Sequence, residues 1–152
     1  MIIESTRLGE LEVEQDKIIK FPRGIPGFSE EKEFVLLPYD NDSPFMFLQS
    51  VSEPNLTFLT VDPFCFFKDY EFKLDDQVVE YLELSTEQPP YILNIITVPE
   101  KAEEMTANLL APIIINHSRR LGQQIVLEKS PFTTRHSLFP NGFPIPEPQG
   151  GK

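Results

Sequence analysis

Two histidines and one cysteine are the side chains of this chain whose types could ligate a metal ion or attack a substrate. His117 and His136 have no cysteine or carboxylate close by at the spacing of a metal site. Cys65 stands among the phenylalanines of residues 64–67, and apolar neighbours raise the pKa of a thiol and blunt its reactivity. We interpret Cys65 as a packed core thiol, and we expect neither a metal site nor catalysis from these three residues.

The acidic and glycine-containing segments do not indicate a cofactor either. Residues 62–76 contain four aspartates that could bind Ca²⁺ or Mg²⁺, but their spacing is irregular and no glycine pivot lies among them. Turn and helix-cap roles fit these aspartates better. Residues 24–27 carry a proline where a phosphate-binding loop needs free N–H groups. We therefore predict a protein that is not an enzyme and has no cofactor.

The charge of the chain indicates which partners are favoured. The 152 residues include 13 Lys and Arg against 24 Asp and Glu, a formal net charge of −11. Such a balance disfavours direct binding of nucleic acid or of an anionic membrane surface, because both need basic side chains. It leaves a protein partner with a basic surface open. Sixteen of the acidic residues fall within residues 1–76.

The elements that would position any site are short strands. Fifteen prolines interrupt the chain, and long helices do not tolerate such spacing. Between them lie segments rich in β-branched and aromatic residues, some with period-two alternation. We predict a mostly β, small single-domain, barrel-like or sandwich-like antiparallel fold with one or two short helices. The expected strands are Ile2–Thr6, Gly9–Glu14, Lys17–Phe21, Glu33–Leu37, Phe45–Val51, Thr57–Val61, Tyr91–Val98, Ala107–Leu110, Ile113–His117 and Gln123–Leu127.

One helix is predicted at Asp75–Leu82, with Asp75 or Asp76 capping its first amides, and a second helical turn at Glu100–Glu104. We expect one domain over residues 1–139. Residues 140–152 contain four prolines and three glycines, which predicts a disordered tail. The start lacks a secretion signal and a single cysteine fits a reducing compartment, so we expect a cytoplasmic protein.

Two apolar features are candidate contact sites. In residues 21–28, prolines fix φ and glycines allow turns, so Gly24, Ile25 and Phe28 lie in a preorganised loop. Such a loop either presents its apolar side chains to a partner at low entropic cost or makes a tight crossover between strands. Phe64 and Phe66 either anchor a partner or fill the core. The sequence leaves both alternatives open.

This loop, Phe21-Pro22-Arg23-Gly24-Ile25-Pro26-Gly27-Phe28, resembles an early motif of the flagellar assembly factor FliW family. Further matches follow in order and cover residues 1–138. They include Leu48-Gln49-Ser50, Asp62-Pro63-Phe64, Leu74-Asp75-Asp76, Thr106-Ala107-Asn108-Leu109-Leu110-Ala111-Pro112-Ile113-Ile114-Ile115-Asn116 and Thr134-Arg135-His136.

The resemblance implies a small barrel-like β fold, no catalysis and two protein partners. One is flagellin, held before export; the other is the RNA-binding carbon storage regulator CsrA, which represses flagellin translation. Export of flagellin would free the assembly factor to bind CsrA and lift the repression. The alternatives are a flagellin-only chaperone and a small-ligand-binding or enzymatic β-barrel.

We expect the partner-binding residues to combine an acidic group with apolar contacts. The acids of residues 69–76 would repel RNA from a basic regulator. The motif asparagines either contact a partner or hydrogen-bond loop backbone. The full candidate set is Gly24, Ile25, Phe28, Phe64, Phe66, Glu71, Asp75, Asp76, Asn108 and Asn116.

Overall fold

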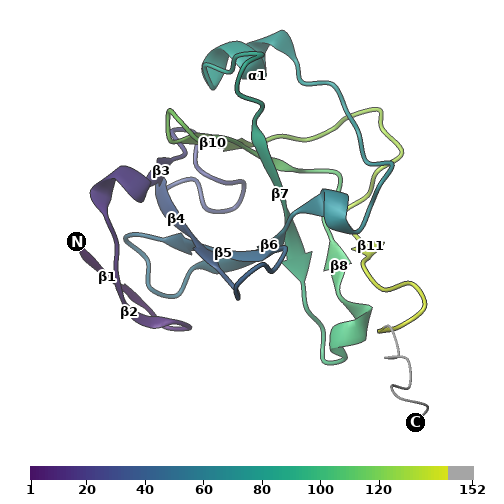
Figure 1. Cartoon of the computed structure of the whole chain (residues 1–152), viewed down its shortest axis with the longest axis horizontal. Helices are drawn as coiled ribbons and strands as arrows, with labels where there is room; N and C mark the ends of the chain where they lie inside the picture. Colours follow the sequence, from purple (N-terminus) through teal and green to yellow (C-terminus); the bar gives the residue numbers. More distant parts are fainter. Residues whose placement is uncertain (144–152) are drawn as a thin grey trace.

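The computed structural model describes residues 1–143, so most of the predicted tail at residues 140–152 lies outside the described residues. Seven strands form a closed barrel (Figure 1). Neighbouring strands pair antiparallel, except that Ile19–Lys20 and Leu121–Gln124 run parallel. The ring closes where Tyr91–Thr97 pairs with Ile113–Asn116. In chain order they are β3 (Ile19–Lys20), β4 (Glu33–Pro38), β5 (Phe45–Ser50), β6 (Thr57–Val61), β7 (Tyr91–Thr97), β9 (Ile113–Asn116) and β10 (Leu121–Gln124).

Within residues 1–143, four further strands lie outside the ring. The hairpin of β1 (Ile2–Ser5) and β2 (Gly9–Glu12) lies on one side of the barrel, whereas β8 (Thr106–Ala107) and β11 (His136–Ser137) extend the sheet beyond β7 on the other side (Figure 1). Apolar residues of the hairpin pack against Val35 on the outer face of β4. The helices are α1 (Asp76–Tyr81) and three 3₁₀ turns at Gln15–Lys17, Pro63–Cys65 and Ala102–Glu104.

The barrel interior is filled by apolar side chains from its own strands and from the loop after β3. Phe21 and Phe34 meet edge to face with ring centroids 5.3 Å apart. Gly122 lies beneath Phe21, where a Cβ atom would come within 2.5 Å of the ring. Fully burying one such side chain contributes about 1.5–3 kcal/mol to stability. The cluster comprises Ile19, Phe21, Ile25, Phe34, Leu48, Leu56, Leu93, Ile113 and Ile115.

The predicted β fold is confirmed, with differences at particular elements. The strand expected at Ala107–Leu110 is β8 and ends at Ala107, because the side chain of Asn108 turns the chain by accepting a hydrogen bond from Ala111 N–H. The strand expected at Gln123–Leu127 is β10 and begins two residues earlier. β11 was missed, since two residues show no period.

Two predictions about single side chains are wrong. Cys65 is exposed and not packed in the core, because it ends a 3₁₀ turn on the surface. Asp75 occupies the N-cap of α1, but its side chain makes no capping bond; its backbone carbonyl accepts from the N–H groups of Val78 and Val79.

The loop after β3 generates a stability prediction. Gly24 has φ +65°, and a Cβ atom there would lie 2.6 Å from Ser29 Cα, whereas Gly27 has φ +88° with open space around it. Gly27→Ala should therefore cost only the left-handed strain, about 1–2 kcal/mol. Gly24→Ala should cost about 1–3 kcal/mol more, because backbone must shift. Urea unfolding of both variants checks this; equal losses would contradict the close approach to Ser29.

Candidate partner-binding surface

A groove of about 570 Å³ runs between the segment at residues 69–78 and the segment at residues 125–132. Its apolar lining comes from Phe72, Val78, Ile125, Leu127 and Phe132. Four acidic residues also line it, against two lysines: Asp69, Glu71, Asp75 and Glu128 face Lys73 and Lys129. The groove is therefore lined by both apolar and charged side chains, and its acidic residues outnumber its lysines.

Tyr70 anchors the first wall of this groove. Its side chain is 3% exposed, its hydroxyl donates to the backbone oxygen of Leu109 at 2.7 Å, and its ring contacts Phe132 at a centroid distance of 4.8 Å. Burial raises the pKa of Tyr70 to about 12. Asp69, in the turn before Tyr70, and Glu71, which follows it, are both exposed, so the buried Tyr70 is flanked in the chain by two exposed acids.

The buried Asn94 and the half-buried Asn108 support this anchor. The Asn94 amide is fully buried and donates from Nδ2 to the Tyr70 hydroxyl at 3.2 Å and to the backbone oxygen of Asn108 at 2.8 Å. The side chain of Asn108 accepts from Ala111 N–H at 3.0 Å. Of the two roles left open for Asn108, the structure provides the hydrogen bond to loop backbone.

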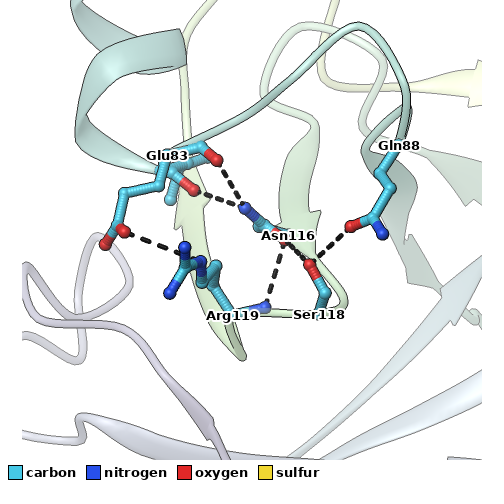
Figure 2. Close-up of polar contacts among 6 residues, drawn as sticks. Glu83, Gln88, Asn116, Ser118 and Arg119 are labelled. Carbon is cyan, nitrogen blue, oxygen red and sulfur yellow. Dashed lines mark hydrogen bonds and ion pairs between the residues drawn. The ribbon is translucent and has the colours of Figure 1, made fainter.

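Asn116 holds the end of α1 against the barrel (Figure 2). Its Nδ2 donates to the backbone oxygens of Leu82 at 2.7 Å and Glu83 at 3.0 Å, and its Oδ1 accepts from Arg119 N–H at 3.2 Å. The carboxylate of Glu83 in turn lies 3.7 Å from the Arg119 guanidinium. Asn116 is buried, so its contacts are internal and position α1.

The structure brings the predicted acidic residues to this groove. Glu71 and Asp75 line it, and Asp76 is the next residue, exposed at the start of α1. We call the groove between residues 69–78 and residues 125–132 the acidic groove. Phe64 is 47% exposed, and its ring centroid lies 6.1 Å from that of the buried Tyr70, but Phe64 does not line the groove.

Phe66 and the loop at residues 21–28 do not line this groove either. Phe66 is half-buried and packs against the aromatic rings of Phe45 and Phe139. Ile25 is 1% exposed within the barrel core, so the expectation that it contacts a partner is replaced by a packing role. Phe28 is 43% exposed and packs on Phe58, with ring centroids 5.4 Å apart.

Gly24 is buried as well, which is consistent with its close approach to Ser29. The loop is tied to α1 by Arg23, whose guanidinium carbon lies 4.1 Å from the ring centroid of Tyr81. Of the two alternatives for this loop, its centre is the packed crossover. Among its candidate residues Gly24, Ile25 and Phe28, only Phe28 is exposed enough to meet a partner.

The second wall of the groove was missed from the sequence. Val126 is 55% exposed between the inward-facing Ile125 and Leu127. Residues 125–127 are apolar without a break and show no alternation with polar residues, so the sequence carries no signal that Val126 is the exposed one.

Two further observations concern residues 1–143. Among them, no three His, Cys, Asp or Glu side chains are placed to hold a metal ion. No helix in this part of the chain has the length and apolar composition needed to cross a membrane.

The Tyr70 contacts generate a prediction about stability and pH. Tyr70→Phe should lower the free energy of unfolding by about 1–3 kcal/mol near pH 8, because the Asn94 and Leu109 polar groups lose a partner. The pKa of Tyr70 in the folded protein, about 12, lies above its ordinary value of 10.0. The stability that the Tyr70 hydroxyl contributes is therefore complete below pH 10 and is lost as the pH rises from 10 to about 12. The wild-type protein should therefore lose more stability than the variant between pH 8 and pH 11.

Urea unfolding at both pH values measures this difference. Tyr39→Phe is the matched control, because Tyr39 is 60% exposed, and it should leave stability unchanged. An identical pH dependence in Tyr70→Phe and the wild-type protein would contradict the prediction.

Asn116 generates a second prediction. Asn116→Ala should lower the free energy of unfolding by about 2–3 kcal/mol, since two backbone oxygens lose their donor. Amide hydrogen exchange in α1 should also become faster. Thr86→Ala, which removes an exposed hydroxyl from the loop after α1, is the control and should cost less than about 1 kcal/mol. If the two variants were equally destabilised, Asn116 would not be what holds α1.

Comparisons with known proteins identify the family. The family described as FliW protein matches residues 2–138. The chain is 53% identical to a flagellar assembly factor FliW of Desulfitobacterium hafniense over the whole of both chains. It is 47% identical to the FliW of Bacillus subtilis, covering 91% of this chain and 96% of that protein.

A solved structure agrees with these sequence matches. The crystal structure of a flagellar assembly factor FliW superimposes with a TM-score of 0.87 at 43% identity, covering 92% of this chain and 98% of that one. The resemblance seen in the motifs is thereby confirmed. The chain belongs to the FliW family of flagellar assembly factors.

Proposed function

We propose that this protein is a non-enzymatic, cytoplasmic binding switch in flagellar assembly, with flagellin and CsrA as its two partners. The observation that carries the proposal is the acidic groove, in which the carboxylates of Glu71 and Asp75 and the apolar side chains of Phe72 and Phe132 line one hollow, with Asp76 exposed next to Asp75. Family membership supports the role in flagellar assembly. The partners come from the resemblance of the sequence to this family.

A binding role also agrees with the state of the exposed thiol. Partial desolvation and the nearby charge of Asp62 raise the pKa of Cys65, which makes its nucleophilic thiolate rarer at neutral pH. This supports a protein that works through contacts and charge.

The acidic groove supplies a physical reason for antagonism with RNA. A regulator that binds RNA presents basic side chains to phosphates. Charges are screened over about 10 Å in 0.1 M salt, so only acids close to the RNA path repel it effectively. Glu71, Asp75 and Asp76 are exposed and adjacent, and we assign them this repulsion.

The same groove suits the flagellin side. Its apolar and acidic side chains fit an amphipathic helix that carries basic residues along the edge of its apolar face. If both partners use this groove, flagellin and CsrA compete, and the free protein reaches CsrA only after flagellin has left.

The test is a titration of the protein into CsrA bound to a labelled RNA. The triple variant E71Q/D75N/D76N should still form the complex with CsrA, but it should release about tenfold less RNA at equal saturation, because three repulsive charges are gone. Complex formation is followed by native electrophoresis and RNA release by fluorescence anisotropy.

The matched control is E10Q/E12Q/E14Q, which removes three exposed carboxylates at the β1–β2 hairpin and should release RNA like the wild-type protein. RNA release that is unchanged in E71Q/D75N/D76N would refute the electrostatic mechanism. A wild-type protein that binds flagellin but displaces no RNA from CsrA would instead be a flagellin-only chaperone.

A further inference from the structure

One end of the barrel opens into a second pocket, of about 690 Å³, with apolar walls. Leu36 and Tyr91 pack against the barrel core beneath it, and Met46 adds its thioether. Pro89 and Pro90 form another part of the wall, and prolines hold that backbone stiff. A largely preformed apolar cavity of this size is typical of small-molecule sites, which span about 300–1,000 Å³.

The rim of this pocket is basic, which contrasts with the net charge of −11. Lys17 precedes β3, His117 follows β9 and Arg120 precedes β10, and all three line the pocket. Partial desolvation and the charges of Arg120 and Lys17 lower the pKa of His117, which places both cations near its imidazole and favours the neutral form of that imidazole.

No carboxylate within residues 1–143 neutralises this cluster. The ion pair found in that part of the chain joins Arg119 to Glu83 and leaves Lys17, His117 and Arg120 without an acidic partner within 4 Å. Glu14 and Glu87 line adjoining hollows beside Lys17 and His117, but neither lines this pocket. The two cationic side chains of Lys17 and Arg120, together with the imidazole of His117, make the rim of this apolar cavity complementary to an anion with an apolar body.

We propose that this pocket binds a small amphipathic carboxylate. The apolar body of the ligand lies against Leu36, Met46 and Tyr91, and its carboxylate lies among Lys17, His117 and Arg120. Arginine suits this role because its guanidinium can pair with both oxygens of a carboxylate. The site is separate from the acidic groove, with which it shares no lining residue.

The test uses a matched pair of probes, 2-naphthoate and the neutral 2-naphthamide, which differ only in the charged group. Wild-type protein should bind 2-naphthoate about tenfold more tightly than 2-naphthamide, because two or more cations face the carboxylate. The double variant K17Q/R120Q should lose this preference and still bind the amide within about twofold of the wild type. Isothermal titration calorimetry measures the four affinities.

Arg119→Gln is the control, since Arg119 is the neighbouring residue, is exposed, and does not line the pocket. It should leave both affinities unchanged. Equal binding of the two probes by the wild-type protein, no binding of either, or the same loss in R119Q as in K17Q/R120Q would overturn the proposal.

A second measurement needs no variant. In the NMR spectrum of the wild-type protein, 2-naphthoate should shift the resonances of His117 and Tyr91, whereas those of Phe72 and Val126 at the acidic groove should stay in place. Shifts confined to the groove residues would also overturn the assignment.

Discussion

Closure of the barrel is the constraint on which the rest of this structure depends. The ring is completed by two pairings that join distant parts of the chain, β3 with β10 and β7 with β9. A closed ring has no unpaired edge, and it surrounds a space that side chains must fill. The strands alone do not fill it: Ile25 enters from the loop after β3 and is fully buried with them. The loop motif is therefore part of the core.

Once the barrel is closed, buried polar side chains position the loops around it. Tyr70 and Asn94 hold the segment that forms one wall of the acidic groove, and Asn116 holds the end of α1. In each case a side chain bonds to a backbone carbonyl that would otherwise be buried without a donor. The exposed acids owe their positions to these internal contacts, although they make few contacts themselves.

The two concave sites differ in charge because different loops reach them. Residues 69–78 and 125–132 bring four acids to the groove, whereas the ends of β3, β9 and β10 bring three basic residues to the barrel end. The excess of acids in the groove agrees with the net charge of −11, whereas the basic residues of the pocket at the barrel end are opposite in sign to it. A protein of this size can thus present an acidic face to a macromolecule and keep a separate site for an anion.

The sequence alone determined the short strands, the single short helix, the FliW motifs and the proximity of Glu71, Asp75 and Asp76, because these properties are local. Periodicity and proline spacing act over a few residues, and neighbours in sequence stay neighbours in space. Only the tertiary structure decided that Ile25 points inward, that residues 125–132 face residues 69–78, and that Lys17 meets Arg120. These outcomes depend on strand register and ring closure, which pair segments about a hundred residues apart and leave no local pattern.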